Sequence, residues 1–158
     1  MLIRTFKKVD GAKVKKLISS IMKNEFGQES RAYPEDDLND ISRAYGGERD
    51  VFFVACEESE IIGTVAIKGE DEGTALLRRL FIHPEYRHSG YGLKLVREAI
   101  NFCKGKGYRV VVFRSTDRMV QANNLCRKLG FVERARLNFG PFQILKFTLN
   151  CRDISERK

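Results

Sequence analysis

The sequence predicts a single domain of the α/β or mixed α+β class, built on one mixed sheet. Its 158 residues suit one compact domain. Its periodic segments follow the order strand, two helices, three strands, helix, strand, helix and two strands, so both element types share one chain. A strand, a glycine-bearing turn, a helix and a further strand surround Gly90, and such a unit forms a right-handed parallel crossover.

The N-terminal part is expected to form one strand and two helices. Leu2 to Phe6 is a short strand, and Asp10 can cap the first helix through its carboxylate. Gly27 to Tyr33 is polar and is expected to be a loop. Pro34 begins the second helix, which has acidic residues in its first turn and ends at Gly46. The apolar positions at helical spacing in these helices are Val14, Leu17, Ile18, Ile21, Met22, Leu38, Ile41 and Tyr45.

Three strands follow in the middle of the chain. Val51 to Cys56 and Ile61 to Ile67 are separated by a short acidic turn and therefore predict a hairpin. Thr74 to Ile82 carries apolar residues on both faces. Burial on both faces is typical of a central strand.

The C-terminal half is expected to alternate helices and strands. The expected helices run from Gly90 to Lys106 and from Val120 to Leu129, and the strand between them from Arg109 to Arg114. Two final strands, Phe131 to Ala135 and Phe142 to Leu149, surround a turn at Asn138, Phe139, Gly140 and Pro141. Arg152 to Lys158 is expected to be a frayed tail, which leaves residues 1–151 as the domain.

Composition narrows the class of protein. The net charge of +8 could attract nucleic acid, an anionic cofactor or an acidic partner. The chain lacks a basic motif with interleaved aromatics, which disfavours nucleic acid. It has no apolar run of ~18 residues and no signal-peptide core, so we expect a cytoplasmic protein without a membrane span. The spacing of cysteine and histidine predicts reduced thiols and no metal site.

The most informative segment reads R-H-S-G-Y-G and spans Arg87 to Gly92. It lies between an apolar strand and an amphipathic helix. The first amides of a helix have no intrahelical acceptor and can bind a phosphate. Gly90 and Gly92 would let the backbone approach a bulky anion, and Arg87 adds positive charge. Neither the P-loop nor the dinucleotide fingerprint fits, because no Gly-Lys-Ser/Thr follows and the third glycine position is Leu95.

The segment L-R-R-L-F-I-H-P-E-Y-R-H-S-G-Y-G-L-K-L resembles the acyl-CoA-binding motif of the GCN5-related N-acetyltransferase (GNAT) family. That motif has Arg or Gln, two residues, Gly, one residue, and Gly or Ala, which Arg87, Gly90 and Gly92 match. Downstream, Leu125 to Phe131 resembles the family segment L-Y-x-x-x-G-F, and Ala122 fits the alanine before it. The resemblance implies a central mixed, mostly antiparallel sheet of about seven strands flanked by helices, with a splayed parallel pair at the acyl-CoA slot.

The resemblance also implies a donor, acetyl-CoA, and a mechanism. The acceptor amine, on a small molecule or a peptide, would attack the thioester directly. A backbone amide at Leu80 would donate to the thioester carbonyl, and the pantetheine arm would pair with the strand there. The resemblance allows a homodimer. The residues that it implies for cofactor binding are Leu80, Phe81, Ile82, Arg87, His88, Ser89, Gly90, Tyr91, Gly92 and Leu93.

The sequence departs from the family pattern in three respects. Cys126 replaces a tyrosine that can protonate the leaving thiolate, and Met119 replaces a frequent asparagine. Cys126 is either such an acid or a small residue that packs beside the cofactor arm. No general base is evident, because the central strand carries Arg78 and the following strand Arg114 where other members have an acid.

The acceptor is expected to bind near the first two helices, at Tyr33, Asp36 and Asp37. The acids there could attract a cationic amine or could simply favour the dipole of a helix start. Two functions follow: an N-acetyltransferase, or a non-catalytic acyl-CoA-binding module of the same fold. A nucleic-acid-binding domain, whose affinity would fall steeply with salt, is a third.

Overall fold

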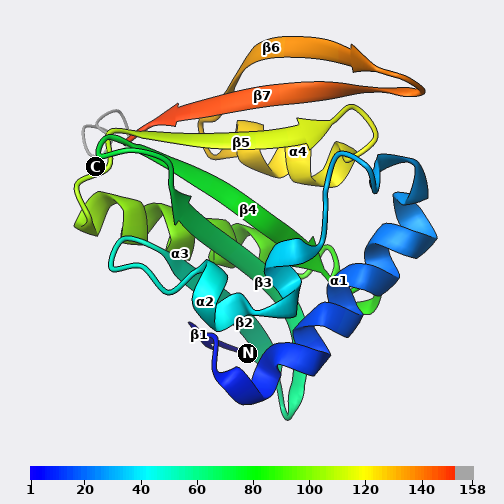
Figure 1. Ribbon diagram of the computed structural model, residues 1–158, viewed down its shortest axis with the longest axis vertical. Coiled ribbons are helices and arrows are strands. Elements are labelled where there is room, and N and C mark those ends of the chain that lie inside the picture. The colour runs from blue at the N-terminus through cyan, green and yellow to red at the C-terminus, as the bar shows by residue number, and fades with distance from the viewer. Residues whose placement is uncertain (152–158) are drawn as a thin grey trace.

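The computed structural model describes residues 1–151 as one mixed sheet with helices on both faces (Figure 1). Its seven strands lie in the order β1-β2-β3-β4-β5-β7-β6. The strands are β1 (Leu2–Thr5), β2 (Val51–Glu57), β3 (Glu60–Gly69), β4 (Thr74–Ile82), β5 (Val110–Thr116), β6 (Val132–Phe139) and β7 (Phe142–Asn150). The α-helices are α1 (Gly11–Glu25), α2 (Ile41–Ala44), α3 (Tyr91–Gly105) and α4 (Val120–Lys128).

The sheet confirms the predicted fold class and the central place of β4. All neighbouring strands pair antiparallel except β4 and β5, which pair parallel and are joined through α3. The unit around Gly90 is therefore the predicted parallel crossover. The strand β6 extends beyond its expected end at Ala135, because it pairs with β7 as far as the turn at Gly140.

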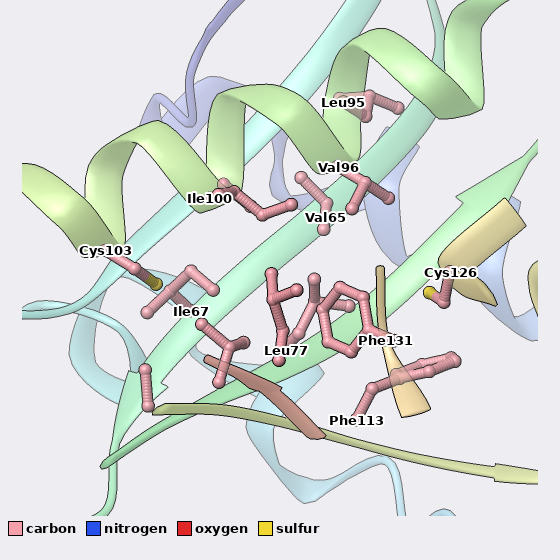
Figure 2. Close-up of a cluster of buried hydrophobic side chains, with 14 of the residues drawn as sticks. Val65, Ile67, Leu77, Leu95, Val96, Ile100, Cys103, Phe113, Cys126 and Phe131 are labelled. Carbon is pink, nitrogen blue, oxygen red and sulfur yellow. The ribbon is translucent and has the colours of Figure 1, made fainter. Parts of the chain in front are cut away.

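Two hydrophobic cores lie on opposite faces of the sheet. One is covered by α3 and α4, and Figure 2 shows Leu95, Val96 and Ile100 of α3 over Val65 and Leu77 of the strands. The other is covered by α1 and the segment that ends in α2. Because successive strand residues point to opposite faces, β2, β3 and β4 supply side chains to both cores, as expected for strands with continuous apolar runs.

The predicted second helix is wrong as a single element. A short 3-10 helix, Asp36–Asn39, precedes α2, and Asp40 between them has a non-helical backbone. The Asp40 carboxylate accepts a hydrogen bond from the backbone N–H of Arg43 at 3.2 Å. Asp40 therefore acts as the N-cap of a new helix and interrupts the earlier one.

The predicted cap at Asp10 is also wrong. Asp10 has a helical backbone, and a 3-10 turn, Lys8–Asp10, precedes α1. Its carboxylate accepts hydrogen bonds from the Arg4 guanidinium at 2.8 and 3.0 Å and from the Lys7 backbone N–H at 2.7 Å. The aspartate thus joins β1 to the turn before α1, and its side chain accepts no hydrogen bond from the first turn of that helix.

The sequence also predicts reduced thiols, no membrane span and a frayed C-terminal tail. All four cysteines are buried, and none forms a disulfide within residues 1–151. In that part of the chain, every helix is too short or too polar to cross a membrane. The expected tail, Arg152 to Lys158, lies outside the described residues.

Candidate functional site

A slot opens where β4 and β5 separate. The two strands pair only over Thr74–Leu77 and Val110–Phe113. Beyond this point β4 continues to Ile82, while β5 stays paired with β7 as far as Thr116. The backbone groups that face the slot have therefore lost their partner strand, which leaves room for an extended ligand to pair with β4.

A cavity of about 920 Å³ occupies this slot. Its walls come from β4, β5, the turn before α3, the end of α1 and α4. The expected site residues that line it are Tyr33, Leu80, Phe81, Ile82, Arg87, His88, Gly90, Gly92 and Leu93. Those that do not line it are Asp36, Asp37, Ser89, Tyr91 and Cys126.

The turn before α3 presents backbone amides to this cavity. His88 and Gly90 have positive φ angles, 64° and 86°, and α3 begins at Tyr91. Within residues 1–151, the N–H groups of His88, Ser89 and Gly90 meet no acceptor, and those of the first helical turn have none within the helix. A run of unpaired N–H groups beside a left-handed residue is an anion-binding arrangement.

The two glycines of the turn serve different purposes. A Cβ on Gly90 would meet nothing within 4 Å, but its φ of +86° is one that L side chains rarely adopt. A Cβ on Gly92 would lie 2.9 Å from Cδ2 of Leu125. Gly90 is therefore required by backbone conformation, whereas Gly92 lets the start of α3 pack closely against α4.

The Arg87 side chain is bound within the protein. Its Nε donates to the Ile82 carbonyl at 3.0 Å, and its two terminal nitrogens donate to the Glu25 carboxylate at 2.6 and 2.8 Å. This bidentate pair joins the end of α1 to the end of β4. The guanidinium charge expected for a phosphate is thus already paired with a carboxylate.

A β-bulge interrupts β4 at the slot. Arg79 has a φ of +55°, and the pairing register of β3 with β4 shifts between Thr64 and Ala66. The Thr64 hydroxyl donates to the Arg79 carbonyl at 2.7 Å and holds the bulge. An extra residue in a bulge redirects the backbone groups that follow, and here the next residue is Leu80.

The Arg79 side chain fixes the bulge to the segment before α2. It is 6% exposed, donates to both carboxylate oxygens of Asp37, and donates to the Pro34 carbonyl at 2.6 Å. Tyr45 donates its hydroxyl to Asp37 at 2.6 Å. Burial alone would raise the pKa of Asp37, but the hydrogen bonds from Arg79 and Tyr45 outweigh it and hold the pKa below its ordinary value.

The remaining acceptor-side residues lie in three places: the cavity wall, the interior and the surface. Tyr33 lines the cavity, and its hydroxyl donates to the Arg114 carbonyl at 3.1 Å. Burial, and then the charge of Glu29, raise the pKa of Tyr33. Glu29, in the expected loop, is fully buried and lies 3.7 Å from the Arg118 guanidinium. Asp36 is exposed.

Cys126 is buried in the core under α3 and α4, beside Phe131 and Phe113 (Figure 2). Burial raises the pKa of its thiol to about 12. This environment suits a small packing residue.

The chain was compared with known protein families, proteins and structures. Residues 15–131 match the Acetyltransferase (GNAT) family. The chain belongs to the GNAT family. The GNAT chain is 27% identical over 130 residues to the probable N-acetyltransferase camello of Xenopus tropicalis. The aligned region covers 79% of this chain and 58% of that protein. It is 31% identical over 101 residues to N-acetyltransferase 8 of Homo sapiens, covering 60% of this chain and 44% of that protein.

The GNAT chain spans about half the length of these curated relatives. Among solved structures, a GNAT acetyltransferase from Staphylococcus aureus Mu50 superposes with a TM-score of 0.81 at 23% identity. The match covers 95% of this chain and 98% of that one. At 23% sequence identity, this structural similarity shows a shared fold and nothing more.

The GNAT site differs from its sequence-based expectation in its charged residues. Glu25 is the one carboxylate among the described residues that line the cavity, and Arg87 holds both of its oxygens. Glu25 as a site residue and Arg79 as the partner of Asp37 were not predicted from the sequence. The sequence signal for Arg79 is the pair Arg78–Arg79 inside an apolar strand; successive residues face opposite sides, but the pattern does not say which arginine is buried against an acid.

Proposed function

We propose that this protein is an N-acetyltransferase that transfers an acetyl group from acetyl-CoA to an amine by direct attack. The main observation that supports this proposal is the slot between β4 and β5, which ends at the run of unpaired backbone amides before α3. Its volume of about 920 Å³ lies in the range of sites for large ligands. Membership of the GNAT family supports the same donor.

The amides from His88 to Leu93 would bind the diphosphate of the donor, and the β4 backbone from Leu80 to Ile82 would pair with its pantetheine arm. The Leu80 N–H would donate to the thioester carbonyl oxygen, where negative charge develops during attack. A donor fixed in place before the reaction stabilises that charge without reorganisation. The Arg79 bulge, held by Thr64 and Asp37, keeps this amide in position.

In the reaction, the amine nitrogen forms a bond to the acetyl carbon. The carbon–sulfur bond breaks, and its electron pair leaves on sulfur as the CoA thiolate. The amine proton must also leave. Because the carboxylate of Glu25 is held by Arg87, we infer that the amine attacks in its neutral form and that the proton released after attack passes to the departing thiolate or to solvent.

The second candidate is a non-catalytic acyl-CoA-binding module. It is favoured by Met119 at the cavity wall, by the burial of Cys126, and by the lack of an unpaired carboxylate among the described lining residues. The cytoplasmic location and the homodimer stay predictions.

Calorimetric titration with acetyl-CoA, followed by a thiol-release assay with a panel of amines, separates the candidates. An N-acetyltransferase binds acetyl-CoA at one site and releases CoA only when an acceptor is present. One-site binding without release for any amine would establish the binding module. Absence of acetyl-CoA binding would reject both.

A further inference from the structure

Two arginines line the inner end of the slot, one on each of the strands that separate there. The parallel register pairs Leu76 with Val112 and Leu77 with Phe113, so Arg78 and Arg114 are the next residues on each strand. Leu77 and Phe113 belong to the core under α3 and α4. Because side chains alternate along a strand, Arg78 and Arg114 face the opposite side of the sheet, the side of α1 and α2. Both line the cavity.

Further contacts agree with this placement. The Arg78 guanidinium lies 5.9 Å from the ring centre of Tyr45, which packs in the core beside α1. The Tyr33 hydroxyl bonds to the backbone of Arg114. The arginines therefore lie on the side of the sheet where the acceptor is expected.

Among the described residues, no carboxylate binds either arginine directly; the charge of Arg78 acts on Asp37, whose carboxylate already accepts hydrogen bonds from Arg79. Within residues 1–151, the side chains of Arg78 and Arg114 make no ion pair and no hydrogen bond, in contrast to Arg79 and Arg87, which are both held by carboxylates. Two positive charges in the wall of one cavity favour a bound anion there.

The phosphates of the donor are too far away to be that anion. Arg78 precedes Ile82 by four residues, about 13 Å at roughly 3.3 Å per residue of extended strand. The amides proposed to bind the diphosphate begin beyond Ile82, at His88. The two arginines therefore lie at the acetyl end of the slot, where the acceptor enters.

The cavity also has an apolar wall on the side of α1. Phe26, Tyr33 and Met119 line it and pack against the core beside α1. A ligand that fits this environment combines an anionic group with an apolar group. Guanidinium groups bind planar carboxylates through two parallel hydrogen bonds.

We propose that the acceptor is an amine that also carries a carboxylate and an apolar substituent, as an apolar α-amino acid does, and that Arg78 and Arg114 bind the carboxylate. This inference rests on the proposed function, because it assumes that the amine of the bound molecule is acetylated. The carboxylate itself takes no part in the transfer. It orients the amine towards the thioester.

Binding of product-like probes tests the anion site without turnover. With CoA present at saturation and ~0.15 M salt to screen the general surface charge, N-acetylphenylalanine and its neutral counterpart N-acetylphenethylamine are compared by calorimetry. We expect the carboxylate probe to bind at least about tenfold more tightly. Arg114→Gln and Arg78→Gln should each remove most of this difference.

Lys146→Gln is the matched control, because Lys146 pairs with Arg114 on β7 and is exposed but does not line the cavity. It should keep the preference. Equal binding of the two probes, or an unchanged preference in Arg114→Gln, overturns the inference. Preference for the carboxylate without acetylation of any amine would retain the anion site and reject the proposed transferase. Equal acetylation of phenylalanine and phenethylamine would retain the transferase and reject the inference.

Discussion

Gly90 is the residue on which the donor site most depends. Its φ of +86° costs an L residue about 1–2 kcal/mol, and a β-branched side chain adds bulk where the ligand would approach. We expect Gly90→Val to remain folded and to bind acetyl-CoA at least about tenfold more weakly, measured by calorimetry. Gly105→Ala, at the other end of α3 and also in open space, should bind normally. Unchanged affinity in Gly90→Val would remove this turn from the donor site.

Cys126 offers a second test at a single residue. A thiol buried in the core, with its pKa raised to about 12, is a packing residue in our interpretation. Cys126→Ala should then lose about 1 kcal/mol of stability and a few degrees of Tm, while kcat changes little. General acids contribute about 10²- to 10⁴-fold. A loss of kcat in that range, with Tm unchanged, would assign the acid to Cys126.

At the level of elements, the Asp37–Arg79 pair attaches the segment before α2 to the bulge of β4. Its side chains are 10% and 3% exposed, and breaking such a buried pair costs about 3–5 kcal/mol. Asp37→Asn should therefore unfold at a lower urea concentration at pH 7. Because the folded pKa of Asp37 lies below its unfolded value, ~3.9, the wild type keeps this stabilisation above about pH 4 and loses it as pH falls through the folded pKa.

The measurement is urea unfolding of both proteins at pH 7 and near pH 3. The difference in unfolding free energy should be largest at pH 7 and should shrink at low pH, because the unfolded wild type then binds a proton that the folded protein, with its lowered Asp37 pKa, binds less readily. Asp36→Asn is the control, since Asp36 is exposed and adjacent. A difference that stays constant with pH would mean that Asp37 contributes by shape and not by charge.

Sequence periodicity predicted elements well where apolar spacing is regular. The stripe from Val14 to Met22 and the runs in β2, β3 and β4 are buried as expected. Sequence periodicity failed where a single polar residue decides which of two local structures forms. Asp40 could continue a helix or cap a new one, and the hydrogen bond to Arg43 that decides this is short-range geometry. Glu29 looked like part of a polar loop because the element that buries it, the end of β5, is remote in sequence.

For the whole molecule, the donor half of the site was more predictable than the acceptor half. Unpaired amides at a helix start are a local property, so the turn at Gly90 could be found from a few residues. The acceptor side joins α1, β4 and β5, which the chain brings together only through the sheet. The partners Asp37 and Arg79 are 42 residues apart. Asp37, one of the acids expected to attract an amine, is therefore neutralised by the buried Arg79.

Acetyl-CoA should stabilise the whole domain and not only its slot. The proposed contacts involve β4, the start of α3 and the β4–β5 divergence, which belong to the sheet that carries both cores. A ligand that binds only the folded protein adds about 2.7 kcal/mol at one hundred times its Kd. For a domain of this size, that raises Tm by roughly 5–10 °C, measured by thermal unfolding at increasing acetyl-CoA. Adenosine 3′,5′-bisphosphate, which has no pantetheine arm, should give a much smaller shift, because it cannot pair with β4. Equal shifts with the two ligands would place the donor on the charged surface outside the slot, and Gly90→Val would then respond like the wild type.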